Sequence, residues 1–377
     1  MIGSQAKSLT FWGRVQSLPL ILITLICVIV GIGATALYSA AGGDFNRWSS
    51  MHLIRFVPLF LMMLFIALTH LKWWYWAAYP LWILGILLLL IVEIMGHVGM
   101  GAQRWINLGF MNLQPSELMK VAVVMALARY YHDQTLTGLR TYKSLLWPLV
   151  IMGAPMGLVM MQPDLGTALM IGMAGASVLF MAGVRMRLFI GGVISTIAIV
   201  PLSYLYVLKG YQRKRVDTFL DPASDPMGAG YHITQSKIAI GSGGVDGKGF
   251  LEGTQSRLNF LPEKQTDFIF TLWAEEWGMI GCLGILTLYI ATFVFGFIYA
   301  MQAKHMFAKL IVLGLTMNLS LYVIINTGMV MGLMPVVGVP LPLISYGGSA
   351  MLAALICYGL IMSAKVFRGQ PLPRGDI

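Results

Sequence analysis

Charged residues are scarce in this sequence. Lys, Arg, Asp and Glu make up 11% of its 377 residues, and apolar residues make up 58%. A soluble globular chain carries about 25% charged residues. The apolar residues form long runs with few charges, which is typical of transmembrane helices. Alternating segments of about ten residues, the pattern of a membrane β-barrel, are absent. We therefore predict an all-α integral membrane protein.

Cysteine is also scarce, and the signatures of several soluble enzyme classes are missing. Cys27, Cys282 and Cys357 lie inside apolar runs without a C-x-x-C pattern. This excludes a disulfide framework and favours small buried hydrophobes. No H-E-x-x-H, G-x-S-x-G or paired Cys/His metal spacing occurs, so the sequence does not support the mechanisms that depend on those motifs.

Nucleic-acid and nucleotide binding are both disfavoured. The net charge of +10 is typical of basic cytoplasmic loops and of contact with anionic headgroups. We therefore expect membrane lipids, and no nucleic acid, as partners. The glycine-rich stretch from Gly243 to Lys248 is one residue short of a P-loop and lacks the following Ser or Thr. It also follows no soluble strand, so we reject a nucleotide site there.

The apolar runs predict about ten transmembrane helices in a single membrane domain, residues 1–377. No A-x-A site follows the first run, so we expect it to be retained and not cleaved as a signal peptide. The predicted spans are Leu18–Ala40, Met51–His70, Trp74–Met95, Pro115–His132, Leu145–Met161, Asp164–Gly183, Leu188–Leu208, Phe268–Ala300, Phe307–Leu333 and Leu341–Val366. The eighth exceeds the roughly 20 residues that a bilayer needs, so it should tilt or project.

The basic residues of the short loops predict the orientation. With both termini cytoplasmic, the opposite short loops and their flanking helix ends hold only Arg47, Arg55, Arg104 and Lys120. Most of the remaining short-loop Lys and Arg then fall on the cytoplasmic side, as the positive-inside rule requires. One large extracytoplasmic loop, residues 209–267, follows between helices 7 and 8.

That loop is the only long polar interval in the chain. It holds eight of the 25 Lys and Arg residues. Long intervals of this kind are usually functional, so we place the reaction there, facing a cavity between the helices. Its segment YHITQSKIAIGSGG predicts a short amphipathic helix with a glycine cap. We expect Ile233, Ile238 and Ile240 on the membrane side, and Gln235 and Lys237 facing outward or inward.

A basic cluster opens the loop. Arg213, Lys214 and Arg215 stand just beyond span seven. The cluster is either a solvated patch that meets anionic headgroups or a clamp for phosphate oxygens, which guanidinium groups bind bidentately. Both interpretations stay open on the sequence alone.

Asp267 closes the loop at the junction of water and membrane. Glu263, Lys264 and two polar residues precede it, and three apolar residues follow. A helix N-terminus lowers the pKa of a carboxylate, and apolar neighbours raise it. Such tuning suits a general base. The alternative is an N-terminal helix cap, which stabilises a helix by about 1 kcal/mol.

A second charged position lies inside a predicted span. Pro115 stands at the first helical position, and Glu117 and Lys120 share one helix face at i, i+3 spacing. A charge in a span costs roughly 2.5–3.5 kcal/mol. The two side chains should therefore pair and face a protein cavity. They either hold the helix to its neighbours or line the substrate cavity.

The motifs resemble one known family along most of the chain. The strings GAQRW, QPSELMK, QPDLGT, DPASDPMGAGYHITQSKIAIGSGG, GTQSRLNFLPEKQTDFIF and PLISYGGS occur in the family's order between Gly101 and Ser349. On these strings the sequence is similar to the SEDS family (shape, elongation, division and sporulation). The short termini and the GTQS and FLPEKQTDF wording favour its elongation branch. No departure is evident at the motif positions.

The resemblance implies a peptidoglycan glycosyltransferase with ten transmembrane helices. It would polymerise lipid II at the outer face of the cytoplasmic membrane, for cell elongation and rod shape, and release undecaprenyl pyrophosphate. The family's catalytic carboxylate falls on Asp267, as general base. The implied partners are a class B penicillin-binding protein (a transpeptidase), other elongation-complex proteins, lipid II and undecaprenyl-linked glycan.

Further residues are expected to bind the substrate. The resemblance places cavity residues at Arg104, Glu117, Lys120, Asp164, Gln212, Gln235 and Lys237, and the residue patterns add Arg213, Arg215, Glu263, Lys264 and Ser345. The departing diphosphate needs positive charge, which Arg213, Arg215, Lys237 or Lys264 could supply. A divalent cation, Mg²⁺ or Mn²⁺, could also supply it. The sequence indicates no certain cofactor and no metal ligands.

Two other functions compete with the transferase. A lipid II flippase should show charged or broken-helix sites at the bilayer midplane and repeat symmetry. No inverted repeat is evident, and the polar groups concentrate at the predicted outer face. A scaffold that only recruits the transpeptidase is the third possibility. Both alternatives predict that Asp267→Asn leaves their activity unchanged.

Overall fold

The computed structural model describes most of the chain. The described residues are 10–95, 97–99, 102–107, 109, 112–134, 145–192, 194–195, 198, 210–221, 228–258, 260 and 263–372. Of the ten predicted spans, the seventh, Leu188–Leu208, lies largely outside these residues.

The described elements are mostly helices. They are α1 (Phe11–Gln16), α2 (Leu20–Ala40), α3 (Ser49–Leu68), α4 (Leu71–Met95), β1 (His97–Gly99), β2 (Ala102–Asn107), β3 (Asn112–Leu113), α5 (Pro115–Asp133), α6 (Leu146–Met161), α7 (Leu165–Met181), α9 (Gly210–Leu220), α10 (Ala229–Gly243), α11 (Thr254–Arg257), α12 (Ile269–Gln302), α13 (Met306–Val330) and α14 (Gly348–Val366).

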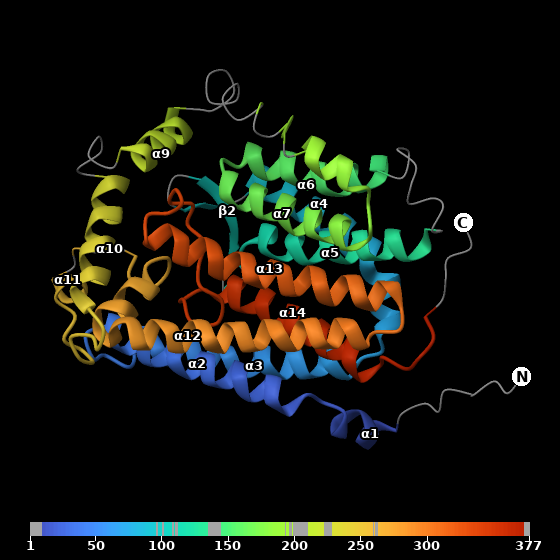
Figure 1. Cartoon of the computed structure of the whole chain (residues 1–377), viewed down its shortest axis with the longest axis horizontal. Coiled ribbons are helices and arrows are strands. Elements are labelled where there is room, and N and C mark those ends of the chain that lie inside the picture. Colours follow the sequence, from blue (N-terminus) through green and yellow to red (C-terminus); the bar gives the residue numbers. More distant parts are fainter. Residues whose placement is uncertain are drawn as a thin grey trace, which may run out of the picture.

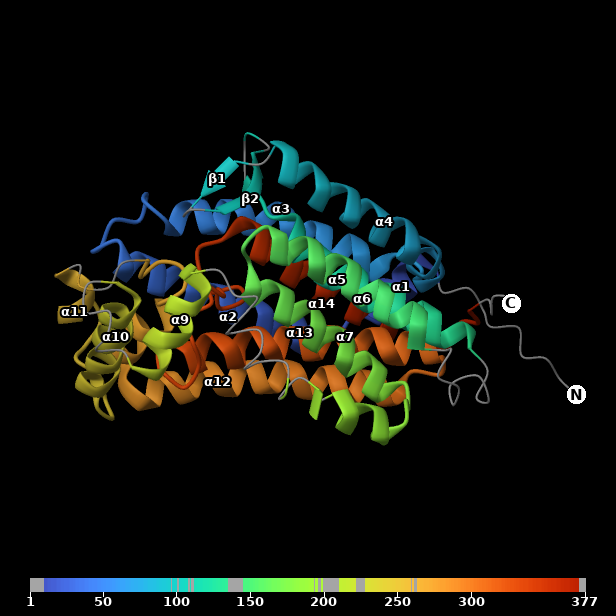
Figure 2. The ribbon, with the colours of Figure 1, turned by 90° about the horizontal axis from the view of Figure 1, so that it is seen from above.

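The long helices form one elongated bundle. α13 and α14 run through its middle, with α2, α3 and α12 on one side and α4 to α7 on the other (Figure 1). Figure 2 shows that α9, α10 and α11 gather at one end of the bundle, whereas α1 lies at the opposite end. We call these the loop end and the terminal end. The connection between α2 and α3 also lies at the loop end (Figure 2).

Six of the described helices are long and apolar enough to cross a membrane. They are α2, α3, α4, α12, α13 and α14, and α6 and α7 are shorter apolar helices. The central pair is the most enclosed, with 72% of the span in α13 and 78% in α14 buried by other helices. The surrounding helices expose large apolar side chains, such as Ile54, Phe65 and Ile290. Lipid tails suit such a surface, and the chain is a multi-pass membrane protein.

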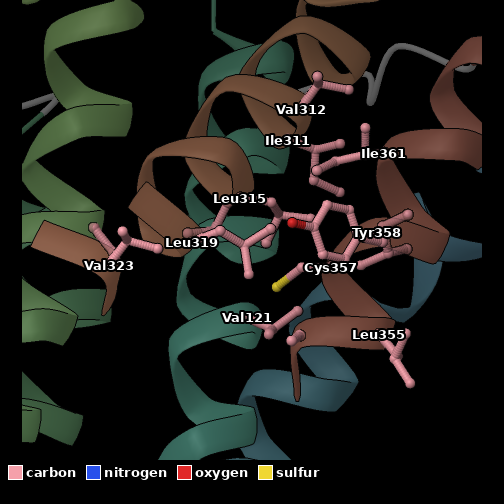
Figure 3. Close-up of a cluster of buried hydrophobic side chains, with 14 of the residues drawn as sticks. Val121, Ile311, Val312, Leu315, Leu319, Val323, Leu355, Cys357, Tyr358 and Ile361 are labelled. Atoms are coloured by element: carbon pink, nitrogen blue, oxygen red, sulfur yellow. The ribbon is translucent and has the colours of Figure 1, made fainter. Parts of the chain in front are cut away.

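The core lies where α5, α13 and α14 meet. Figure 3 shows Leu315 and Leu319 of α13 facing Tyr358 and Cys357 of α14, with Val121 of α5 beside them. All five side chains are buried. Contacts between branched and aromatic side chains fix the separation of these helices. The core thereby supplies the rigid frame on which the loop end is built.

Nine of the ten predicted spans coincide with helices, with some corrections. The tenth was predicted to begin at Leu341, but α14 begins at Gly348. The preceding residues form a loop in which Leu341, Leu343 and Ile344 are each 1% exposed. We call residues 338–346 the re-entrant loop. Its apolar sequence looks like part of a span because it is buried in protein, where non-helical backbone is tolerated.

The prediction of an all-α chain was incomplete. β1, β2 and β3 form a three-stranded antiparallel sheet between α4 and α5. His97 pairs with Trp105, and Asn107 pairs with Asn112. The sheet positions Arg104 of β2 near the start of α7, as described below.

The eighth span is one long helix with a break. α12 contains 34 residues, and Gly278 has φ 61° and ψ −158°, which interrupts the helix. The backbone groups freed there pair with the preceding loop: Met279 N–H donates to Gly244 O at 3.0 Å, and Gly249 N–H donates to Glu276 O at 3.0 Å. A Cβ on Gly247 would lie 2.1 Å from Glu276 O. The loop therefore needs glycine there in order to approach the helix.

Candidate active site at the loop end

Asp267 lies directly before α12 and is half-buried. The N-cap residue of α12 is Phe268, whose side chain makes no capping bond. The alternative that Asp267 caps this helix stays a prediction, as does its role as general base. Phe268, Ile269 and Phe270 are buried behind it. The carboxylate stands at the boundary between the polar loop and the apolar bundle, as the sequence predicted.

The backbone around Asp267 is held by the re-entrant loop and by α13. Tyr346 N–H donates to Gln265 O at 2.8 Å, and Ser345 Oγ donates to Thr266 O at 2.6 Å. Asn326 of α13 donates from Nδ2 to Asp267 O at 2.9 Å and to Val339 O at 2.7 Å. These bonds reach successive residues of the same short segment. They fix the position of Asp267 relative to the bundle.

The re-entrant loop is itself tied to three surrounding helices. His52 Nε2 of α3 lies 3.1 Å from Leu343 O, and the Tyr289 hydroxyl of α12 donates to Pro342 O. Gly33 of α2 lies against Leu343 and Ile344, where a Cβ would come within 2.8 Å of backbone atoms. Buried carbonyl groups need such partners. The support of Asp267 thus extends from α13 to α2, α3 and α12.

Glu263 and Ser345 have different places in this arrangement. Glu263 Oε2 accepts from Gln265 Nε2 and from Thr266 Oγ1, each at 3.2 Å. Ser345 is 3% exposed and accepts from Leu341 N–H at 2.8 Å while donating to Thr266 O. Both predicted binding residues therefore shape the Asp267 segment. Their contact with substrate stays a prediction.

Arg104 and Asp164 form an ion pair at the start of α7. Arg104 Nε lies 3.5 Å from Asp164 Oδ2, with the side chains 21% and 6% exposed. Arg104 also donates to Pro163 O. Asp164 caps α7 by accepting from Thr167 N–H at 3.2 Å, which satisfies one free N–H of the first turn. The pair joins the β-sheet to α7 and leaves part of the guanidinium accessible.

Glu117 and Lys120 pair as the i, i+3 spacing predicted. Lys120 Nζ lies 2.7 Å from Glu117 Oε1, and their side chains are 1% and 6% exposed. Tyr322 of α13 donates its hydroxyl to Glu117 Oε2, and its ring lies 4.1 Å from Lys120 Nζ. This closed cluster joins α5 to α13. The geometry is that of a structural ion pair, and a role in substrate binding stays a prediction.

The predicted amphipathic helix is present as α10, but one of its faces was assigned wrongly. Ile233 is 2% exposed and packs inside the protein, not against the membrane. The reason is that α10 packs on α12 and α13: Ser236 Oγ lies 2.7 Å from Thr271 Oγ1 and donates to Val330 O at 2.7 Å. Ile238 is exposed, whereas Ile240 is partly buried against the core, and membrane contact of these two residues stays a prediction. Lys237 is exposed and lies beside Gly332.

The remaining predicted residues are only partly placed. Gln212, Arg213 and Arg215 belong to α9 at the loop end, where Arg213 is half-buried. The side chains of Gln212 and Arg215 lie outside the described residues. Gln235 of α10 is half-buried. Their roles in binding stay predictions.

One buried carboxylate and two arginines complete the loop end. Glu275 is 0% exposed and accepts from Lys248 Nζ at 2.7 Å and from Gln255 N–H at 2.9 Å, which ties the loop before α11 to α12. Arg55 lies over the ring of Tyr346 at 5.0 Å, and Arg47 lies over Trp48 at 4.5 Å. In the sequence, the two arginines could have been noticed because they are basic residues on the predicted outer side, where few cations are expected.

Lys264, in the segment that leads to Asp267, is half-buried. Burial lowers the pKa of Lys264, and the positive charge of Arg47 lowers it further. The positive charges of Arg47 and Lys264 therefore repel each other. An anion placed between them would relieve this repulsion.

Among the described residues, no three His, Cys, Asp or Glu side chains lie together so that they could hold a metal ion. An apolar groove of about 330 Å³ lies between α3, α4, α5 and α14 and is lined by residues that include Trp74, Leu118 and Ile356. Its chemistry suits a hydrocarbon chain.

Comparisons with known proteins identify relatives over nearly the whole chain. A family model for FtsW, RodA and SpoVE, described as "cell cycle protein", matches residues 14–370. The peptidoglycan glycosyltransferase MrdB of Escherichia coli K12 is 42% identical over 95% of this chain and 96% of its own.

Solved structures agree with the sequence comparison. A chain from a peptidoglycan synthase complex, titled for its coordination of polymerization and crosslinking, has a TM-score of 0.82 at 32% identity. It covers 94% of this chain and 99% of its own. The crystal structure of Thermus thermophilus rod shape determining protein RodA has a TM-score of 0.71 at 28% identity, with 94% and 98% covered.

Proposed function

Because the chain belongs to the FtsW/RodA/SpoVE family and is a peptidoglycan glycosyltransferase, we propose that it polymerises lipid II for cell elongation with Asp267 as general base. The observation that carries this proposal is the fixed backbone of the segment that carries the Asp267 carboxylate at the loop end. Two elements, the re-entrant loop and α13, hold the segment from Gln265 to Asp267 through three hydrogen bonds. A base that is held in one position avoids the cost of orienting itself during the reaction.

The reaction breaks one bond to C1 of the donor sugar and forms another. The 4-hydroxyl of the acceptor lipid II attacks C1 of the lipid-linked donor strand. As the new C1–O bond forms, Asp267 takes the hydroxyl proton. The bond from C1 to the diphosphate oxygen breaks, and its electron pair leaves with undecaprenyl pyrophosphate. General base catalysis of such a step is worth about 10²–10⁴-fold in rate.

The membrane arrangement follows from the same proposal. About ten spans with both termini cytoplasmic place the loop end on the outer face, where lipid II polymerisation takes place. The groove between α3, α4, α5 and α14 would receive a lipid tail from the bilayer. Lateral entry is expected because the substrate carries its own membrane anchor.

The predicted binding residues would then surround the sugar and diphosphate. Candidates on the described side chains are Arg104, Asp164, Arg213, Gln235, Lys237, Glu263, Lys264 and Ser345. Gln212 and Arg215 are further candidates from the sequence. Glu117 and Lys120 would act at a distance, by fixing α5 against α13. A divalent cation would supply positive charge at the diphosphate when bound.

A class B penicillin-binding protein is the expected partner. One structural relative belongs to a peptidoglycan synthase complex in which polymerization and crosslinking are coordinated. A polymerase that hands its strand to a transpeptidase fits that description. Other elongation-complex proteins would join the same assembly.

The test is glycan formation from purified lipid II in liposomes that contain the chain and its class B partner. We expect wild-type protein to produce glycan strands and Asp267→Asn to produce almost none. A flippase or a scaffold would be unaffected by this change. Strand formation by Asp267→Asn at the wild-type rate would remove the mechanism, and no strand formation by the wild type would remove the function.

A further inference from the structure

Four cations stand on the proposed outer side in short loops or helix ends, and they divide into two kinds. Arg104 lies 3.5 Å from Asp164, and Lys120 lies 2.7 Å from Glu117. Within the described part of the chain, Arg47 and Arg55 have no carboxylate within ion-pair distance. Each instead lies over an aromatic ring, at 4.5 Å and 5.0 Å from the ring centroid.

This difference matters because of where Arg55 lies. It is half-buried in the second turn of α3, which is a membrane-spanning helix. A cation in such a place is costly, and it normally pairs with an anion. The contact with the ring does not use up the hydrogen-bonding capacity of Arg55. A guanidinium that lies over a ring can still direct its N–H donors to a planar or tetrahedral anion.

The two arginines are connected to the segment that carries Asp267. Tyr346, the ring beneath Arg55, donates its backbone N–H to Gln265 O at 2.8 Å. Arg47 is close enough to Lys264 to lower the pKa of that amine, in addition to the effect of burial. Gln265 and Lys264 precede Asp267 by two and three residues. Arg55 is thus linked to the segment that carries Asp267 through Tyr346, and the charge of Arg47 acts on the same segment at Lys264.

We infer that Arg47, Arg55 and Lys264 form a binding site for the phosphate oxygens of a lipid-linked diphosphate. This inference rests on the proposed function and deepens it, since the diphosphate is the leaving group. Arginine forks bind phosphate oxygens through paired N–H bonds, and a lysine adds a point charge. The site would stabilise the charge that develops as the bond from C1 to the diphosphate breaks.

Binding to the catalytically silent Asp267→Asn variant tests the site without turnover. The probe is undecaprenyl diphosphate in nanodiscs of zwitterionic lipid, titrated by native mass spectrometry or a fluorescence competition assay. Arg55→Gln should weaken binding about tenfold, and Arg47→Gln with Arg55→Gln about 100-fold, as expected for charge-assisted hydrogen bonds. Arg55→Lys keeps the charge but loses the fork, so it should fall between Arg55→Gln and the parent.

The controls separate this site from general electrostatics and from misfolding. Lys72→Gln, an exposed cation at the terminal end beyond α3, should leave binding unchanged. Each variant must melt within a few degrees of the parent, and Arg55→Lys supplies a second variant if Arg55→Gln does not. Undecaprenyl monophosphate should bind more weakly than the diphosphate.

Two results would overturn the inference. One is binding of undecaprenyl diphosphate that is equal in the parent and the double variant. The other is displacement of the probe by phosphatidylglycerol at equal concentration, which would make the cluster a lipid headgroup site. Failure of the wild type to form glycan would count against the proposed function alone, because the binding comparison does not depend on turnover.

Discussion

Two groups of charged residues show how the same residue types can have different roles. Glu117, Lys120 and Tyr322 satisfy one another in a nearly inaccessible position. Arg47 and Arg55 lie on aromatic rings and have no carboxylate partner in the described residues. A buried cation that is paired with a carboxylate holds helices together. A cation that lies over a ring keeps its hydrogen-bond donors available for a ligand.

Breaking the closed cluster should have the largest effect on stability. Glu117→Gln leaves Lys120, which is 1% exposed, without its counter-charge. Loss of one partner from a buried pair costs about 3–5 kcal/mol, measured as the free energy of unfolding in detergent. A loss below about 1 kcal/mol would show that the pair is not structural.

A matched triple variant sharpens this result. Glu117→Leu with Lys120→Met and Tyr322→Phe removes the whole cluster and should recover most of the lost stability, because apolar replacement of a buried pair is often near neutral. If glycan formation also recovers, the cluster acts structurally. If stability recovers without activity, the cluster lines the substrate cavity.

Removing a side chain that holds the backbone of Asp267 should have the next largest effect on stability. Asn326→Leu removes the bonds to Asp267 O and Val339 O, which should cost about 1–3 kcal/mol of stability. A displaced base should also slow glycan formation about 10–100-fold. Asn318→Leu is the matched control on the same helix, since Asn318 is buried against Cys357. Equal rates in the two variants would contradict the supporting role.

The partly exposed ion pair of Arg104 and Asp164 should contribute an intermediate amount to the free energy of unfolding. Arg104→Gln breaks the contact with Asp164 and the bond to Pro163 O, and it should cost about 1–2 kcal/mol. Arg104→Lys keeps the charge but not the bonds to the loop carbonyl, and should recover about half of that. The melting temperature in one detergent measures both. An unchanged value for Arg104→Gln would mean that the sheet is held by other contacts.

Arg47 and Arg55, which lie over aromatic rings, should contribute least to the free energy of unfolding. Arg55→Gln loses a cation–π contact worth about 0.5–1 kcal/mol and leaves no buried carboxylate behind. Its free energy of unfolding should therefore fall by at most a third of the loss in Glu117→Gln. A comparable loss would place Arg55 among the structural cations and would remove the contrast between the clusters.

Much of this arrangement could be predicted from the sequence. The apolar runs located nine of the helices, and Pro115 marks the first turn of α5 as expected. The pairing of Glu117 with Lys120 followed from spacing on one helix. The boundary position of Asp267 followed from the change from polar to apolar residues. These features depend on neighbours in the chain, which a sequence displays directly.

Other features depend on contacts between distant segments and could not be predicted. The re-entrant loop is as apolar as a span, and only its burial by α2, α3 and α12 distinguishes it. The position of Ile233 depends on which surface α10 packs against. An apolar residue suits both the lipid and the protein interior, so its hydrophobicity does not predict which of the two it faces. Arg47 and Lys264 are more than 200 residues apart in the chain, so their proximity required the fold.

The central claim is that Asp267 takes the proton from the acceptor hydroxyl, and one measurement on one preparation tests it. Lipid II binding and glycan formation are followed together for wild-type protein and Asp267→Asn, each in complex with the class B partner. We predict binding within about threefold of wild type and a rate lowered at least about 100-fold, the lower limit for losing a general base. A rate within tenfold of wild type, with binding intact, would contradict the claim.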